Sequence, residues 1–498
     1  FKAMAVPVDQ KKAVAAVAVY GSFLVYSTSW VSRMCMLLLV CLVYYVFAER
    51  PKRQRSMSFT SALMARGTFP PASAPIDPII HALVYYKKLP SMEQLKELVL
   101  PTLQKYDRFT CTAHPYDGGW EWRDAGKELD EKQHFFSHSV RSEQEAISVV
   151  EGFMCEPMSV DAQPMWEFHR VVNSGSGLSM LVIRMHHSIG DGISIYKVFS
   201  SIFKDKDGKP LPPLPAFTRS EKQGKFFTFS WNLLGKVLVA IKDVLTLPSS
   251  AFDSPILFTD PNKRKGTRGG PRKIVLFPHQ PLARIKAIKD KAGVTVNDVL
   301  MSATAGAIRR YCLYRKDPTF ASGEKLQVRA LLPIAFPRKP SAQPYHGRFG
   351  DLRNLFVFLS AALAVNEESP VARLQATAAT TAPLKTSPFA MVQLKFQNLV
   401  GPLLPQFLAR QTCLDTFNRH SVVFSNVPGP AEPVQFGGEV VDHFQMVFPN
   451  MITQAGILSY NGRVSMDMVI DPSYITEPQK LTEFFADELD ALEQELAL

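Results

Sequence analysis

The sequence predicts an α/β protein of two domains, preceded by an apolar N-terminal segment. At 498 residues the chain is too long for one ordinary hydrophobic core. Strand-like and helix-like patterns alternate in both halves, beginning with a strand, a helix and a second strand within 79–113. We therefore expect an N-terminal membrane anchor at 1–56, a first domain at 57–215, a crossover at 216–272 and a second domain at 273–498.

The N-terminal block carries one charge, Arg33, between residues 13 and 48. Its first part, 13–31, is close to the length of about 20 apolar residues that a bilayer requires. Basic residues on both sides favour a hairpin or two helices with both ends in the cytosol. A single span at 25–47 and a helix buried in a protein core are the alternatives, whereas a cleaved signal peptide lacks a clear cleavage site. The number of spans stays open.

Composition excludes several classes of protein. The net charge of +11 occurs in short clusters beside apolar segments, not in one stripe, which favours an anionic membrane surface or a polyanionic cofactor over nucleic acid. The six cysteines are scattered without a Cys-x-x-Cys pair, so neither a zinc site nor a disulfide framework is expected. This cysteine usage fits a reducing, cytosol-facing environment.

The first domain opens with a predicted strand at 79–86. Ser91 and Gln94 have the spacing of a capping box, and the apolar residues that follow form one face of a helix. Residues 109–113 are expected to form the next strand. A hairpin is then predicted from strands 168–172 and 178–185, joined by a polar turn.

The crossover contains an apolar, aromatic stretch with interspersed lysines at 226–247, which suits either a membrane-surface helix or a helix packed on the second domain. The basic loop 263–273 is interpreted as solvated, with lipid headgroups or cofactor phosphates as the alternative. After this loop, strand-like and helix-like patterns alternate again. The expected strands are 273–277, 327–334, 356–363, 421–424, 457–460 and 464–470, the expected helices are 282–291, 299–313, 372–385 and 478–496, and the apolar segment 388–411 is expected to line a pocket.

Two adjacent histidines, His186 and His187, end the apolar strand at 178–185 and are followed by Asp191 and Gly192. The ends of strands are places where scaffolds present chemistry. An imidazole of near-neutral pKa can take a proton from an alcohol. Asp191 would orient the ring or make a structural ion pair, and the glycines on either side of it permit a tight turn. The alternative is a satisfied pair of core histidines with an aspartate helix cap.

The motif His-His-x-x-x-Asp-Gly is the signature of the CoA-dependent acyltransferase superfamily, and the sequence resembles its wax ester synthase/diacylglycerol acyltransferase family. Asp-Phe-Gly-Trp-Gly of the plant hydroxycinnamoyl type is absent, and the family's Pro-Leu-Trp is Pro-Met-Trp here. The N-terminal block, which the common bacterial pattern lacks, suggests a eukaryotic, membrane-anchored member. The matching stretches, in family order over roughly 57–495, are Pro164-Met-Trp-Glu167, His186-His187-Ser-Ile-Gly-Asp191-Gly192, Val296-Asn297-Asp298-Val299, Ser425-Asn426-Val427-Pro428-Gly429-Pro430 and Ser459-Tyr460-Asn461-Gly462.

This resemblance implies two chloramphenicol-acetyltransferase-like domains with an active-site tunnel between them. His187 would be the general base that activates a lipid alcohol for attack on an acyl-CoA thioester, beside His186. Asp191 would be structural. The resemblance also implies a role in substrate binding or oxyanion stabilisation for Asn297, Asp298, Asn426 and Trp166. Trp166 is alternatively interpreted as a residue that anchors the packing. The residues expected in the catalytic motif are His187, His186, Asp191 and Gly192, and those expected to bind substrate or the oxyanion are Asn297, Asp298, Asn426 and Trp166.

The expected co-substrate is therefore acyl-CoA, with no bound cofactor and no metal, and the acceptor is a lipid alcohol. Diacylglycerol would give triacylglycerol and a fatty alcohol would give a wax ester. The expected location is the endoplasmic reticulum membrane with cytosolic catalytic domains, or a lipid droplet or plastid. A condensation-type enzyme with another donor and a non-catalytic, membrane-anchored lipid-binding protein are the alternative functions.

Overall fold

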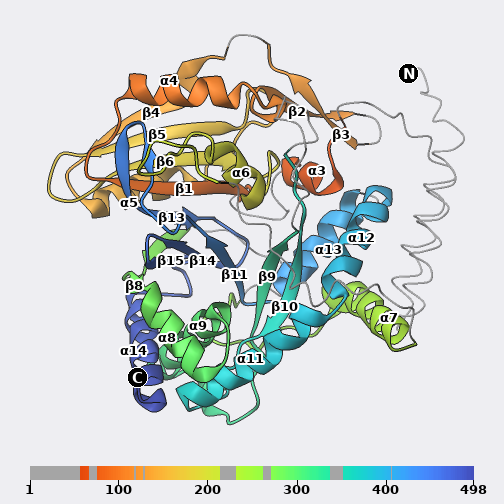
Figure 1. The fold of residues 1–498 in the computed structure, drawn as a ribbon. Helices are drawn as coiled ribbons and strands as arrows, with labels where there is room; N and C mark the ends of the chain where they lie inside the picture. Colours follow the sequence, from red (N-terminus) through yellow and green to blue (C-terminus); the bar gives the residue numbers. More distant parts are fainter. Residues whose placement is uncertain are drawn as a thin grey trace, which may run out of the picture.

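Two β-sheets, each with helices on its faces, form the fold of the computed structural model (Figure 1). The structure describes residues 56–66, 76–116, 119–126, 129–212, 231–261, 271–336, 352–404 and 406–498. The expected membrane anchor at 1–56 lies outside these residues except for its last position, as do 213–230 of the crossover and 262–270 of the basic loop. No helix in the described ranges has the length and apolar character needed to cross a bilayer.

The first sheet is built mainly from the first half of the chain. Its strands are antiparallel except for the parallel pair β4 and β5. The predicted hairpin is confirmed as β5 and β6, and β6 lies at the centre with every residue buried. In order across the sheet the strands are β12 (Gln435–Phe436), β13 (Glu439–Val447), β1 (Ile79–Tyr86), β6 (Ser179–His186), β5 (Trp166–Asn173) and β4 (Phe135–Val140).

Helices α4 (Met92–Leu103) and α6 (Gly192–Phe199) cover one face of this sheet, and α5 (Glu143–Met154) covers the other. The predicted capping box opens α4: Ser91 Oγ accepts from the Gln94 N–H, and Gln94 Oε1 accepts from the Ser91 N–H. The first described helix, α3 (Phe59–Ala65), contributes to the α4 side of the core.

The second sheet has six strands along its main path, with a short seventh strand, β8 (Gln280–Pro281), also paired to β15. The predicted hairpin around Asn461-Gly462 is confirmed as β14 and β15. In order the strands are β10 (Phe356–Ala362), β9 (Arg329–Ala335), β11 (Val422–Pro428), β14 (Thr453–Tyr460), β15 (Arg463–Ile470) and β7 (Lys273–Leu276).

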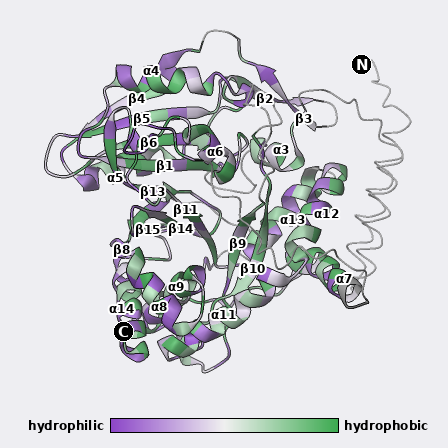
Figure 2. Ribbon diagram, viewed as in Figure 1, coloured by the Kyte–Doolittle hydropathy of each residue, from purple (hydrophilic) through white to green (hydrophobic). Residues whose placement is uncertain are grey.

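Most helices of the second half pack around this sheet, and they alternate hydrophobic and hydrophilic residues along their length (Figure 2). Close packing depends on small residues such as Gly306, where an added Cβ would lie 2.2 Å from Cδ of Glu488. The helices are α7 (Trp231–Thr246), α8 (Leu282–Ala292), α9 (Val296–Tyr314), α10 (Pro318–Ala321), α11 (Pro370–Thr386), α12 (Phe389–Leu399), α13 (Gln406–Asn418) and α14 (Gln479–Leu496).

Two features differ from the sequence expectation. Residues 107–109 form a short helical turn, and the strand begins at 111. Among the described strands, β2 (Cys111–Tyr116) pairs with β3 (Gly119–Asp124) and not with the first sheet. More importantly, β12 and β13 come from the predicted second domain, 273–498, yet they complete the first sheet. The register of β13 on β1 depends on contacts between distant segments, which sequence patterns do not report.

Candidate active site

His187 occupies the turn between the central strand β6 and helix α6. Its backbone N–H donates to the Pro78 carbonyl at 2.7 Å. Asp191 is the N-cap of α6, because its Oδ1 accepts from the Ser194 N–H at 3.0 Å. The predicted strand-to-helix position of the motif is therefore confirmed.

One ring nitrogen of His187 is held by an amide that the sequence did not single out. His187 Nδ1 lies 2.9 Å from Oδ1 of Asn354. Asn354 Nδ2 donates to the His187 carbonyl at 2.7 Å and to Ser61 Oγ at 3.1 Å, and these bonds fix which end of the amide is the oxygen. The oxygen can only accept, so Nδ1 carries the proton and Nε2 keeps a free lone pair.

The surroundings of His187 keep its ring neutral. Burial lowers the pKa of His187 below the ordinary value of 6.5, and the nearby Asp191 carboxylate and the Asn354 hydrogen bond oppose this only in part. Phe356 and Phe448 flank the ring with centroids 5.4 and 5.8 Å away. His187 is only partly buried, and within the described ranges no hydrogen bond engages its Nε2. This nitrogen is thus placed to accept a proton.

His186 is a support and not a second base in this geometry. Its side chain is fully buried, and Nδ1 accepts from the Ser188 N–H at 3.2 Å and lies 2.8 Å from Ser188 Oγ. Burial, then the neighbouring His187 and Arg184, lowers the pKa of His186 to about 3, so it stays neutral. The interpretation as a core histidine therefore fits His186, whereas His187 has the geometry of a base.

Asp191 connects the motif by hydrogen bonds to a segment distant in the sequence, 353–355. Its Oδ2 accepts from the Leu355 N–H at 2.8 Å, and its own N–H donates to the Arg353 carbonyl at 3.1 Å. Ser194 adds two bonds to the Arg353 backbone, at 2.8 and 3.0 Å. These bonds connect Asp191 to the backbone on both sides of Asn354 and so position Asn354 beside His187.

The two glycines of the motif, Gly190 and Gly192, differ in the space available for a side chain. A Cβ on Gly190 would lie 2.6 Å from Cβ of Ser194, so the turn requires glycine there. A Cβ on Gly192 would meet nothing within 4 Å, and Gly192 is exposed at the start of α6. Only Gly190 is needed for the tight turn.

Arg108 is a second residue that sequence reasoning missed. Its Nη1 donates to the Ile189 carbonyl at 2.8 Å and to the Ser188 carbonyl at 3.2 Å, and its guanidinium lies 5.2 Å from the centre of the Trp122 ring. The side chain is buried, and its two hydrogen bonds fix the turn that follows His187. Neither Arg108 nor Asn354 lies in one of the sequence motifs described above, so no signal in the sequence identified them.

The remaining predicted site residues form separate contacts. Asp298 completes a capping box with Thr295 and accepts from Thr381 Oγ1 at 2.5 Å, and Lys385 lies 3.1 Å away as its ion-pair partner. Asn426 Nδ2 donates to Asn297 Oδ1. None of the hydrogen bonds among the described residues joins these side chains to His187.

Trp166 is fully buried, stacks on His134 at 4.1 Å and donates from Nε1 to the Phe109 carbonyl at 2.8 Å, as a packing anchor would. Across the described part of the chain, no cluster of His, Cys, Asp and Glu is arranged to hold a metal ion.

Family models match two parts of the chain that together cover more than half of it. The catalytic domain model of wax ester synthase/diacylglycerol acyltransferase matches residues 138–300, and the model of the C-terminal domain of the same family matches 352–493. The chain belongs to the wax ester synthase/diacylglycerol acyltransferase family. His187 and Asp191 lie in the part matched by the catalytic model, and Asn354 lies in the part matched by the C-terminal model.

Curated relatives of this wax ester synthase/diacylglycerol acyltransferase family member come from bacteria and plants. A probable diacylglycerol O-acyltransferase of Mycobacterium tuberculosis is 27% identical over 298 residues, which are 56% of this chain and 62% of the relative. Wax ester synthase/diacylglycerol acyltransferase 4 of Arabidopsis thaliana is 22% identical over 428 residues, 78% of this chain and 81% of the relative. The chain thus spans less than two thirds of the mycobacterial relative.

Solved structures share the fold of this wax ester synthase/diacylglycerol acyltransferase family member. The wax ester synthase/diacylglycerol acyltransferase of Marinobacter aquaeolei VT8 superposes with a TM-score of 0.57 at 18% identity, covering 89% of this chain and all of the other. The first condensation domain of the calcium-dependent antibiotic synthetase gives 0.56 at 13% identity, with 90% and 97% coverage. The two-sheet α/β architecture is therefore that of this acyltransferase and of condensation domains.

Proposed function

We propose that this protein transfers a long acyl group from acyl-CoA to the hydroxyl of a lipid alcohol, with His187 as the general base. The observation that carries the proposal is the bond between His187 Nδ1 and Asn354 Oδ1 at 2.9 Å, which leaves Nε2 as the basic nitrogen. Family membership supports the reaction class, and the names of the relatives support diacylglycerol or a fatty alcohol as acceptor.

In the proposed reaction, Nε2 of His187 takes the hydroxyl proton as the alcohol oxygen attacks the thioester carbonyl. A carbon–oxygen bond forms and gives a tetrahedral oxyanion. The carbon–sulfur bond then breaks, and the CoA thiolate leaves with the proton that His187 returns. A positioned base of this kind contributes about 10²–10⁴ in rate. No acyl-enzyme forms, so the mechanism needs no nucleophilic serine or cysteine.

The oxyanion requires donors and not acceptors. Asp298 does not suit this role, because its carboxylate is already held by a helix cap and by Lys385. The amides of Asn297 and Asn426, which contact each other, remain the candidates from the sequence. We further propose that the acyl chains occupy a tunnel between the two sheets, as the resemblance implies.

The test is CoA release by detergent-purified full-length protein given palmitoyl-CoA with either diacylglycerol or hexadecanol. Acceptor-dependent release that disappears in His187→Ala supports the proposal, and the better acceptor identifies the product as triacylglycerol or wax ester. Full activity in His187→Ala would exclude the mechanism. Binding of palmitoyl-CoA without release, with either acceptor, would favour the lipid-binding alternative, and release only from a carrier-bound donor would favour a condensation-type enzyme.

We also propose a membrane location, the endoplasmic reticulum with cytosolic catalytic domains, with a lipid droplet or plastid as the alternatives. The apolar block at 13–48 and the net charge of +11 support attachment to a membrane. Imaging of the tagged full-length chain with organelle markers tests this location, and a uniform cytosolic signal would exclude it.

A further inference from the structure

Helices α7 and α12 lie on the same side of the molecule (Figure 1), and both carry exposed apolar side chains. On α7, Leu238 is 57% exposed and Val239 is 58% exposed. On α12, Leu399 is 73% exposed, and no residue of this helix is fully buried. Single exposed leucines are common on protein surfaces, but a cluster on two neighbouring helices marks an interaction site. We call the set Leu238, Val239, Ile241, Met391 and Leu399 the docking face.

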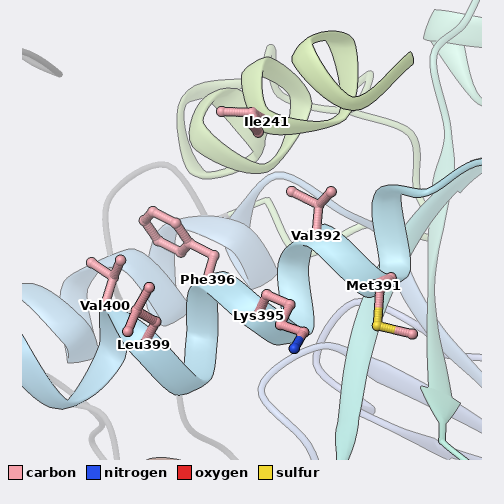
Figure 3. A pocket seen from close by; sticks show the side chains of 7 residues that line it. All are labelled: Ile241, Met391, Val392, Lys395, Phe396, Leu399 and Val400. Atoms are coloured by element: carbon pink, nitrogen blue, oxygen red, sulfur yellow. The ribbon is translucent and has the colours of Figure 1, made fainter. Parts of the chain in front are cut away.

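A groove of about 330 Å³ separates the two helices within this face. Figure 3 shows Ile241 of α7 opposite Val392 of α12, with the other side chains along α12. Only one of the lining residues is charged. The groove is lined by Ile241, Met391, Val392, Lys395, Phe396, Leu399 and Val400.

The charges around the docking face have one predominant sign. Lys236 and Lys242 on α7 and Lys395 on α12 are exposed, whereas Asp243 is the single acidic residue in the sequences of these two helices. Lysine stems can lie along an apolar surface while the ammonium group reaches phosphates. Apolar side chains bordered by lysines are typical of helices that lie in the interface of an anionic membrane.

We propose that the docking face binds an anionic phospholipid bilayer. Leu238, Val239 and Leu399 enter the region of the acyl chains, and the three lysines contact lipid phosphates. The groove between α7 and α12 is then presented to the lipid phase, where an acyl chain can occupy it. Exposure and charge alone support this docking, so it is independent of the proposed acyl transfer.

Fluorescence of an attached probe tests the proposal in the full-length chain. Cysteine is introduced at Leu238 or Leu399 after the six native cysteines have been replaced, and it is labelled with the environment-sensitive dye NBD. Leu313 on α9, which is 49% exposed, provides the matched control position. The labelled proteins are reconstituted into vesicles of phosphatidylcholine with or without phosphatidylglycerol, and dibrominated lipid is used as a quencher.

We expect NBD emission at 238 and 399 to shift to the blue and to be quenched by brominated lipid in the anionic vesicles, with loss of the effect at high salt. The label at 313 should not respond. Equal responses at all three positions would contradict the proposal. Blue-shifted but unquenched emission at 238 and 399 would also contradict it, since the face would then be covered by the chain's own segment 13–48 or by a second copy.

Amide hydrogen exchange of the unlabelled native protein gives a second readout that needs no substitution. Exchange of 235–245 and 391–400 should be at least about tenfold slower in anionic than in zwitterionic vesicles, because docking stabilises both helices against local opening. Helix α14 should exchange equally in both. Unchanged exchange in α7 and α12 would overturn the proposal. Failure of the CoA-release assay would leave this readout intact, so the two proposals fail separately.

Discussion

Asn354 and His187 form a reciprocal pair: the amide oxygen of Asn354 accepts from Nδ1 of the ring, and its nitrogen donates to the carbonyl of the same histidine. The pair joins the two parts of the chain matched by the separate family models. A neutral amide fixes the tautomer without adding charge, so the burial that lowers the pKa of His187 is not fully offset. The ring of His187, the proposed base, is therefore neutral at physiological pH.

Replacement of Asn354 by alanine should lower kcat/KM by about 10²-fold, because the ring loses its preferred tautomer and orientation. Replacement by aspartate should keep the acceptor but add a negative charge, which raises the pKa of His187. The acidic limb of the kcat/KM profile should then move to higher pH. Profiles of kcat/KM against pH, with circular dichroism to verify folding, check both variants. An Asn354→Ala enzyme with unchanged kcat/KM would refute the positioning role.

Replacement of Asp191 by asparagine should move the acidic limb of the kcat/KM profile to lower pH. The Asp191 carboxylate raises the pKa of His187, so its loss lowers that pKa further and extends activity to lower pH. Asparagine also serves as an N-cap through its oxygen, so α6 is retained, but its amide nitrogen cannot accept from the Leu355 N–H, so we expect a lower kcat/KM at all pH values in addition to the shift. The measurement is the pH profile of kcat/KM beside that of the native enzyme. A shift to higher pH would contradict the electrostatic role assigned to Asp191.

The two glycines of the motif form a matched pair for substitution by alanine. Gly190→Ala places a Cβ 2.6 Å from Ser194, so we expect a loss of about 1–3 kcal/mol in the free energy of unfolding, together with lower activity. Gly192→Ala meets open space at the start of a helix and should change stability by less than about 0.5 kcal/mol. Chemical denaturation monitored by circular dichroism distinguishes them. Equal effects at both positions would argue against the steric explanation.

Asp467, on β15, is expected to weaken the fold at neutral pH. It is buried, and this burial raises its pKa well above the ordinary value of 3.8. The unfolded chain ionises Asp467 at lower pH than the folded chain does, so stability falls as pH rises from about 4 through the raised pKa. Asp467→Asn should raise the melting temperature at pH 7.5 more than at pH 4.5. A variant that melts lower at pH 7.5 would show that the ionised carboxylate is needed.

Several local elements could be predicted from the sequence because their causes are local. The capping box at Ser91, the Asn461-Gly462 hairpin and the strand-to-helix position of His187 each depend on a few consecutive residues. The α/β class follows in the same way, whereas the chemistry of the motif stays a prediction. The resemblance added the family, which the family models confirm.

Contacts between distant segments could not be predicted in this way. The pairing of β13 with β1 and the approach of 353–355 to Asp191 each close a long loop, and nothing in the local pattern specifies the partner. For the same reason the residue pattern alone did not distinguish His186 from His187, and only the family resemblance implied that His187 is the base. Their different burial and their different partners, Ser188 and Asn354, distinguish the core histidine His186 from the proposed base His187.

By itself, the sequence predicted His187 as the residue that carries the chemistry and determined the local element on which it stands, since propensity, capping and strand periodicity act over a few residues. Only the tertiary structure decided which nitrogen of His187 is free and which amide holds the other, because that choice depends on a residue 167 positions away along the chain. Burial, which sets the pKa of both histidines, is likewise a property of the packed fold and not of the motif.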